Sequence, residues 1–145
     1  MKQLETLEAF KCARALSRSG YRLTLKKPLD RHFGLADQIR RAGISIPANM
    51  VEGYALGTTS QFVRCLRISL GSVAELKEHL ETARDMDLVA QDDSGPVIAL
   101  AVRTIRLIVG LLRRLESRRG SPFPLPHSPF PFPHHARAVR IARVT

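Results

Sequence analysis

Arginines at helical spacing are the residues of this sequence best suited to bind a ligand. Within the otherwise apolar stretch 97–115, the exceptions are spaced three, four and three residues apart, and they are Arg103, Arg106, Gly110 and Arg113. Arg114 follows directly, so one side of a helix would carry four guanidinium groups. Guanidinium groups form paired hydrogen bonds to phosphate oxygens, which makes this row a candidate surface for the backbone of a nucleic acid. An ordinary solvated helix face would show the same pattern, so both interpretations stay open at this stage.

A second basic row lies in the stretch 3–25. Lys11, Arg14, Arg18 and Arg22 recur there at spacings of three, four and four residues. The apolar residues of the same stretch fall on another side, as expected of an amphipathic helix. Arg14, Arg18 and Arg22 are therefore secondary candidates for contacts with phosphate.

No group of residues has the spacing that catalysis or metal binding requires. His32 falls in a loop, His79 stands alone on a helical pattern, and His134 and His135 are adjacent near the C-terminus. Glycines occur at helix ends or packing positions instead of in a phosphate-binding loop. We therefore expect no metal, no cofactor and no enzymatic activity.

One polar pair needs separate comment. Asn49 and Glu52 lie one helical turn apart beside Pro47 on a largely apolar helix. They could serve proton transfer, but capping a bend at Pro47 or bonding to a neighbouring subunit explains them better.

The helix expected over residues 34–53 is the element around which the others must pack. Its main apolar stripe, at spacings of four, three, four and four, consists of Leu35, Ile39, Ala42, Ile46 and Met50. A second apolar line consists of Ile44, Ala48, Val51 and Ala55. Because two faces are apolar, this helix should lie between neighbours. Pro47 predicts a bend, with Ser45 and Asn49 available to satisfy the groups that the proline leaves unpaired.

Three further helices complete the expected fold. The first covers residues 3–25, weakened at Gly20, and the loop 26–32 follows it. Gly57 should end the second helix, and Thr58 with Gln61 forms a capping box for the third. The third helix carries a heptad seam, which consists of Phe62, Leu66, Ser69, Val73, Leu76, Leu80 and Ala83.

The short turn between the second and third helices makes them antiparallel. Equal counting from that turn places Arg40 and Arg41 near Glu75 and Glu78, as exposed ion pairs. The fourth helix should begin near Ser94 and Pro96, after a loop at residues 90–94. Since it is apolar nearly all round, we expect it to pack inside its own bundle and also against another subunit.

The fold class predicted is all-α, an antiparallel up-and-down four-helix bundle over residues 1–117. Residues 118–145 form a separate basic tail in which six of the nine prolines fall between positions 122 and 133. Such composition predicts a disordered or polyproline-like segment. It could be an unselected extension or, through Pro126 and Pro129, a ligand for a peptide-binding module.

Several short runs occur in a recognisable order: Gln-Ile-Arg-Arg-Ala, Ser-Ile-Pro-Ala-Asn, Glu-Gly and Leu-Gly-Ser-x-x-Glu-Leu. Over roughly residues 7–89, the chain resembles the bacterial four-helix bundle family whose founding members are encoded by intervening sequences within 23S ribosomal RNA genes. The matching positions include Gln38, Arg41, Pro47, Asn49, Glu52 and Gly53. The chain departs from the family pattern in the first loop, where Lys27 precedes Pro28 and Arg31 replaces an acid.

The resemblance implies a small all-helical protein that assembles with copies of itself, as a pentamer. A distant relative is the accessory protein of diversity-generating retroelements, a basic pentamer that works with nucleic acid and a reverse transcriptase. The resemblance thus implies the fold more firmly than the role.

Charge and hydropathy limit the partners. The net charge of +10 and the pI near 10.8 favour polyanions. No uninterrupted apolar run reaches the roughly 18 residues of a membrane span, and Glu5 and Glu8 do not suit a signal peptide. We therefore expect a cytoplasmic protein with no membrane partner, in which Cys12 and Cys65 are buried and reduced.

Two hypotheses of function follow. In the first, the chain is a non-enzymatic, homo-oligomeric accessory protein whose basic helix faces bind RNA or DNA. In the second, it is a scaffold whose basic surface selects an acidic protein partner. The salt dependence of binding would distinguish them, since phosphate contacts release counterions.

Overall fold

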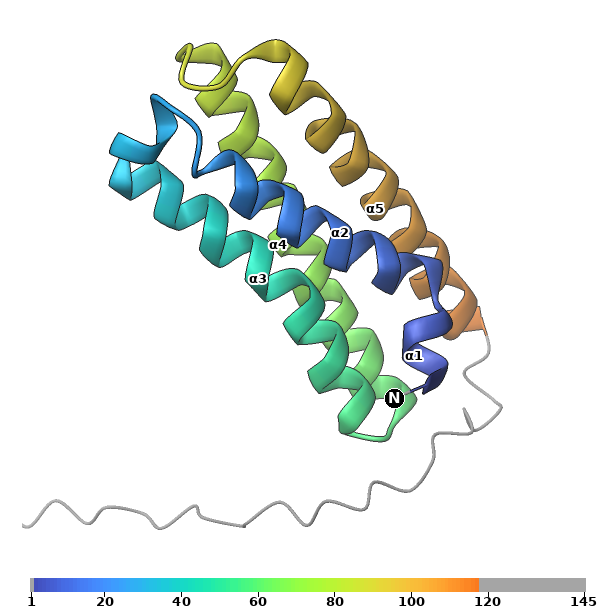
Figure 1. Cartoon of the computed structure of the whole chain (residues 1–145). Coiled ribbons are helices and arrows are strands. Elements are labelled where there is room, and N and C mark those ends of the chain that lie inside the picture. The colour runs from blue at the N-terminus through green and yellow to red at the C-terminus, as the bar shows by residue number, and fades with distance from the viewer. Residues whose placement is uncertain (1, 118–145) are drawn as a thin grey trace, which may run out of the picture.

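Residues 2–117 of the computed structural model are described here, and they form helices throughout (Figure 1). The order is α1 (Lys2–Thr6), α2 (Glu8–Leu23), the 3-10 turn η1 (Leu29–Arg31), α3 (Phe33–Ala55), α4 (Thr59–Asp85) and α5 (Gln91–Ser117). The four long helices, α2 to α5, run alternately up and down side by side, which confirms the all-α bundle. The predictions for the tail and its boundary concern residues 118–145 and lie outside the described residues.

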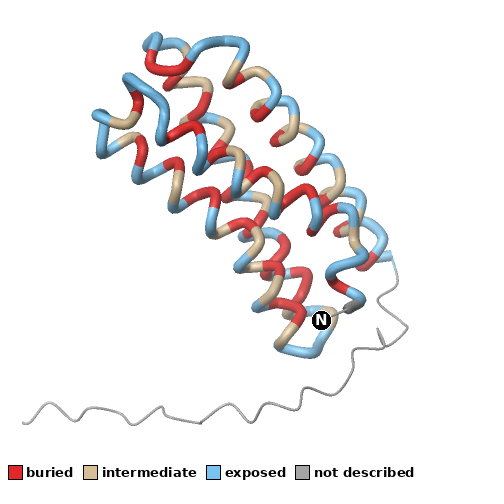
Figure 2. The backbone as a smooth tube through the Cα atoms, in the orientation of Figure 1, coloured by how far each residue is buried: buried red, intermediate tan, exposed pale blue. Residues whose placement is uncertain are grey.

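The heptad seam of α4 lies at the centre of the bundle. Its seven residues are all at most 1% exposed, from Phe62 at the first turns to Ala83 near the end. On α3, Ile39, Ile46 and Met50 are fully buried against it. Buried positions accordingly follow the inward side of each helix in Figure 2. The predicted seam and the main stripe of the second helix are confirmed.

The turn between α3 and α4 has the expected glycine and one half of the predicted capping box, since within the described residues the Gln61 side chain makes no hydrogen bond to the Thr58 amide. Gly57 adopts a positive φ of 75°, a conformation that residues with a side chain rarely adopt and that glycine adopts readily because it has no Cβ. The hydroxyl of Thr58 accepts a hydrogen bond from the amide of Gln61 at 3.3 Å, which satisfies one free donor of the first turn of α4. The two helices therefore reverse direction within a few residues and lie against each other along their length.

The first helix differs from the prediction, because the chain breaks at Leu7. That residue has extended backbone (φ −70°, ψ 124°), which separates α1 from α2 and lets α1 close the end of the bundle. Leu4 is then 1% exposed, and burial of this side chain accounts for the break. Gly20, in contrast, lies inside an unbroken helix that continues to Leu23, with the side chain of Leu76 packed close to it.

Pro47 lies within α3, and the helix continues on both sides of it. Ser69 on α4 donates to the carbonyl oxygen of Ile46 at 2.8 Å, so the neighbouring helix supports this turn. The carbonyl that Pro47 leaves without its helical partner belongs to Gly43. The expectation that Ser45 and Asn49 would satisfy that group is wrong, because Asn49 donates to Ser45 instead.

The predicted ion pairs between α3 and α4 are also wrong. Arg40 donates to the hydroxyl of Thr24 at 2.8 Å and lies over the ring of Tyr21, with 5.1 Å from its guanidinium carbon to the ring centre. Arg41 faces Asp37 at 4.0 Å, on its own helix. Counting residues from the turn does not tell which side of α3 an arginine occupies. Arg40 lies on the side of α3 that faces α2, away from Glu75 and Glu78 on α4.

The last helix begins earlier than predicted, at Gln91 instead of Ser94. Asp92 and Asp93 occupy its first turn, where carboxylates stabilise the positive end of the helix dipole. Ser94 is fully buried and donates from Oγ to the carbonyl oxygen of Ala90 at 3.0 Å, so it is not the N-cap. Lys26 pairs with Asp93, which ties the loop after α2 to the start of α5.

By length and composition alone, α5 could cross a membrane. In the bundle only one side of α5 is fully buried, through Ala101, Thr104 and Ile108, and 28% of its most apolar 18 residues are buried. Every valine, leucine and isoleucine of α5 is at least partly buried by the chain itself. Contact of this partly buried helix with another subunit stays a prediction.

Gly53 offers a direct test of the packing between α3 and α4. A methyl group on this residue would lie 2.5 Å from Cβ of Cys65 and 3.2 Å from Cα of Phe62. Gly53→Ala should therefore lower the free energy of unfolding, measured by urea denaturation, by about 1–3 kcal/mol.

Gly71→Ala is the matched control, since nothing lies within 4 Å of the methyl group that it adds to α4. That variant should gain about 0.5–1 kcal/mol from helix propensity. Equal stability of Gly53→Ala and the parent would mean that the two helices do not approach as closely as described.

Candidate functional site

The arginines of α5 lie on its solvent-facing side. Arg103, Arg106, Arg113 and Arg114 are all exposed, as is Gly110 between them. Only Arg103 comes near an acid, with 4.0 Å between its guanidinium and a carboxylate oxygen of Glu8. Within residues 2–117, the other three have no carboxylate within ion-pairing distance. Their charges are therefore free to bind an anion.

Two of these arginines line a shallow hollow between α5 and the junction of α1 with α2. The hollow has a volume of about 420 Å³, and its lining includes Arg106 and Arg114 together with Thr6 and Leu7. Gly110 lies between the two arginines along α5 and leaves open space where a side chain would stand. The break at Leu7 thus shapes part of this surface, which the sequence did not predict.

Among the residues that line this hollow, the acid is Glu8. A hydrogen bond and the positive charge of Lys11, which lies 2.8 Å away, lower the pKa of the Glu8 carboxyl, with a smaller contribution from Arg103. The carboxylate therefore stays ionised at neutral pH. It places a negative charge at the edge of the arginine row and weakens its attraction for anions.

The arginines of α2 are placed differently. Arg14 and Arg18 lie on the side of α2 that faces α3, and the Arg14 guanidinium carbon is 5.9 Å from the ring centre of Phe10. Arg22 is exposed in the last turn of α2. The candidates therefore form two basic surfaces on the neighbouring helices α2 and α5. Arg113 does not line the hollow beside α5, and Arg22 does not line the groove between α2 and α3.

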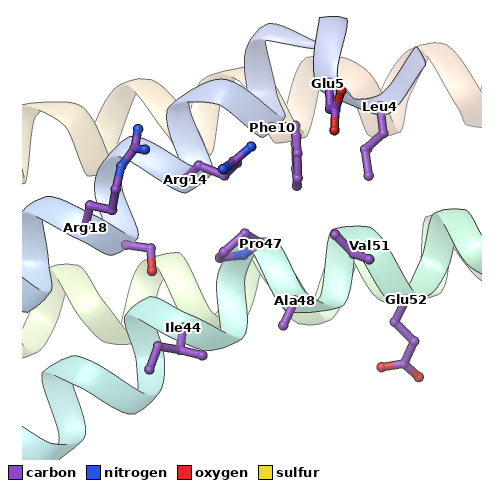
Figure 3. A pocket seen from close by; sticks show the side chains of 11 residues that line it. Leu4, Glu5, Phe10, Arg14, Arg18, Ile44, Pro47, Ala48, Val51 and Glu52 are labelled. Carbon is purple, nitrogen blue, oxygen red and sulfur yellow. The ribbon is translucent and has the colours of Figure 1, made fainter. Parts of the chain in front are cut away.

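An apolar groove separates α3 from α1 and α2 beside Arg14 and Arg18 (Figure 3). Its volume is about 750 Å³, and its apolar lining consists of Leu4, Phe10, Ile44, Pro47, Ala48 and Val51. Ile44 is 56% exposed. Ile44 and Ala48 of the second apolar line are exposed and Val51 and Ala55 are partly buried, so part of this line lies open. α3 nevertheless lies between α2 and α4, as predicted. That line was the sequence signal for this groove, although its position beside α1 was not predictable.

The residues of the family motif all lie on α3 and have separate structural roles. Gln38 and Arg41 are exposed, while Pro47 and Glu52 line the groove. Gly53 is the contact point with α4. Asn49 donates to the carbonyl oxygen of Ser45 at 2.8 Å and to its hydroxyl at 2.9 Å. The Ser45 hydroxyl lies 2.9 Å from that of Ser72, so a small polar network joins α3 to α4.

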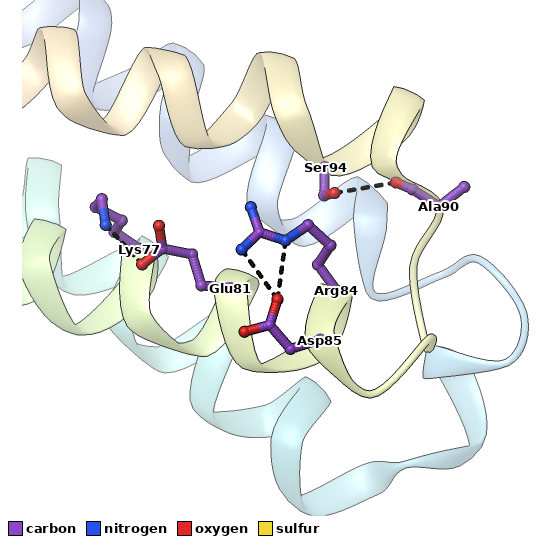
Figure 4. A network of polar contacts seen from close by, with 6 residues as sticks. All are labelled: Lys77, Glu81, Arg84, Asp85, Ala90 and Ser94. Atoms are coloured by element: carbon purple, nitrogen blue, oxygen red, sulfur yellow. Dashed lines mark hydrogen bonds and ion pairs between the residues drawn. The ribbon is translucent and has the colours of Figure 1, made fainter.

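The remaining polar contacts stabilise the bundle. At its other end, Lys77 pairs with Glu81 at 2.6 Å and Arg84 with Asp85 at 2.9 Å, near the buried Ser94 (Figure 4). Across the described residues, no three His, Cys, Asp or Glu side chains gather closely enough to hold a metal ion.

Burial, followed by the charge of Glu52, raises the pKa of the Cys65 thiol, which keeps it protonated.

Comparison with known proteins agrees with this geometry. Residues 5–110 match the family model described as the 23S rRNA-intervening sequence protein. The chain belongs to this family. A similar solved structure, from Bacteroides thetaiotaomicron, is described as a protein of unknown function from the S23 ribosomal protein family. It shares 18% identity and a TM-score of 0.66, over 72% of this chain and 98% of the other. No protein with a curated description matches the chain.

Asn49→Asp tests whether Asn49 is structural. The substitution keeps the shape but replaces the amide donor with a carboxylate, which faces the Ser45 carbonyl oxygen. We expect the free energy of unfolding at neutral pH to fall by about 1–2 kcal/mol. The loss should shrink at acidic pH, where the protonated acid can donate.

Glu52→Gln is the matched control, because Glu52 is exposed and the described part of the chain offers it no hydrogen-bond partner. It should change stability by less than about 0.5 kcal/mol. A pH-independent, unchanged stability of Asn49→Asp would rule out the structural role.

Proposed function

We propose that this member of the family is a non-enzymatic accessory protein that binds the backbone of RNA or DNA through arginine faces of the bundle. The observation that carries the proposal is the exposed row on α5. There, Arg106, Arg113 and Arg114 have no acidic partner among residues 2–117. Guanidinium groups that have no acidic partner keep their donors available for phosphate oxygens.

Binding would come from neutralisation of phosphates and release of their counterions. The exposed aromatic residues of the described chain are Tyr21 and Phe33, and neither lies on α5. The arginine row therefore has no platform on which bases could stack. Recognition would depend on the shape and charge of the backbone more than on base sequence.

Assembly with copies of the chain is part of the proposal. Large apolar side chains are exposed on α3 and α4 outside both hollows, including Phe33 at 79% and Ile68 at 46%. Such residues support contact with a second copy. In an assembly, the arginine faces of several subunits would form a longer basic surface, which raises affinity through several simultaneous contacts.

Arg103→Ala combined with Arg106→Ala tests the role of α5. We expect the full chain to bind a structured RNA and a matched DNA duplex with affinity that falls steeply with salt. In the double variant, the slope of log K against log salt should become shallower by about 1.5–2, because about two phosphate contacts are lost. The measurement is fluorescence anisotropy at several salt concentrations.

Arg31→Ala combined with Arg41→Ala is the control, since it removes the same charge from exposed positions outside both hollows. Equal slopes for the two double variants would exclude a specific α5 surface. Replacement of Arg137, Arg140 and Arg143 in the full chain measures the share contributed by the tail. Weak RNA binding together with tight, salt-tolerant binding of an acidic protein would favour the scaffold instead.

Glu8→Gln should strengthen the same interaction. The carboxylate of Glu8 is ionised beside Arg103, so its removal leaves the arginine row uniformly positive. Affinity for RNA at low salt should rise about two- to fivefold, since one repulsive charge is removed from an exposed surface where interactions between charges are weak.

Glu78→Gln changes the net charge equally at an exposed position on α4, outside both hollows. We expect it to leave the affinity nearly unchanged. A larger effect of Glu78→Gln than of Glu8→Gln would place the nucleic-acid surface elsewhere.

A further inference from the structure

The groove between α1, α2 and α3 is an apolar surface that the described chain leaves open. Its volume of about 750 Å³ is within the range of ligand and peptide sites. Leu4 and Phe10 face Pro47 and Val51 across it (Figure 3). A half-exposed Ile44 at one end shows that the apolar floor continues to solvent, so an occupant would bury it favourably.

The charged rim restricts the occupant. Arg14 and Arg18 lie on the α2 wall, and Glu5 and Glu52 lie toward the other end. Within residues 2–117, none of the four is part of an ion pair. A segment without charges avoids repulsion from either pair, and aromatic rings can stack beneath guanidinium groups.

The chain itself contains such a segment. Residues 120–136 include no lysine, arginine, aspartate or glutamate, although arginines stand on both sides of them. Their apolar side chains alternate with six prolines, and the large ones are Phe123, Leu125, Phe130 and Phe132. Proline-rich chain favours an extended conformation before binding, so docking in a groove costs little conformational entropy.

The attachment point lies within reach of the groove. α5 ends at Ser117, at the same end of the bundle as α1, and Arg67 on α4 holds Glu116 at 2.6 Å (Figure 1). The groove opens on the other side of α1 and α2 from α5. Extended chain covers about 3.1 Å per residue, so six residues span about 19 Å. This is about two spacings between packed helices, each about 8–10 Å.

We propose that this groove is the docking site of residues 122–133 of the same chain. Phe130 and Phe132 enter the apolar floor between α2 and α3, with Arg14 and Arg18 against their rings. Because the segment is tethered, its effective concentration at the groove reaches about the millimolar range, so a weak intrinsic affinity suffices. Docking also holds the basic residues Arg137, Arg140 and Arg143 close to the bundle.

The test is photo-crosslinking in the full chain, with benzoylphenylalanine in place of Phe130. Irradiation should join position 130 to groove residues such as Pro47, Ala48 or Val51, as read by mass spectrometry of peptides. Ala48→Trp fills the groove from an exposed position and should reduce these crosslinks at least about tenfold. Ala74→Trp, at an exposed alanine of α4 outside the groove, should leave them unchanged.

Mixing ¹⁵N-labelled and unlabelled chains identifies the source of each crosslink. Crosslinks within one chain support the proposal. Crosslinks found only between chains would instead assign the groove to a neighbouring copy and overturn it. Crosslinks scattered over the bundle, or equally abundant in Ala48→Trp, would also overturn it. Circular dichroism of each variant confirms that the helices are retained, so a negative result reflects the groove and not unfolding.

Discussion

The close approach of α3 and α4 is the constraint on which the rest of this structure depends. At Gly53 the two backbones come so near that a single methyl group would collide with Cys65. Above that point, the α4 seam and the α3 stripe remain buried over several turns. α2 and α5 then cover the sides of this pair, and the polar bonds of Ser69 and Ser72 hold its register. An apolar seam with small residues at the contact permits this arrangement, because it removes large side chains where backbones must approach.

α3 buries one face completely against α4, and its other apolar face is only partly covered. The second apolar line, with Ile44 and Val51, meets only α1 and part of α2, so a groove remains. The short helix α1 narrows that groove because the chain breaks at Leu7 and folds back over the end of the bundle. α1 and α2 thus border both the apolar groove and the hollow that Arg106 and Arg114 line.

The charges follow the same geometry. The arginines of α5 occupy its solvent-facing side, because the apolar residues of the helix occupy the other sides and are at least partly buried. Other basic groups have acidic partners, among them Lys77 and Arg84 on α4 and Lys26 in the loop after α2. The separation of paired from unpaired basic groups distinguishes a surface that stabilises the fold from one that is free to bind an anion.

The sequence by itself determined the four long helices, the heptad seam of α4, the turn at Gly57 and the side of α5 that carries arginines. Each depends on local periodicity or on backbone preferences, which are encoded within a few residues. Only the tertiary structure decided the break at Leu7, the start of α5 at Gln91 and the partners of Arg40 and Asn49. These depend on which side of a helix meets its neighbour and on the burial of single residues such as Leu4 and Ser94. The two hollows are likewise formed by residues from separate helices, so the second apolar line of α3 signalled an apolar surface but no local pattern could have placed either hollow.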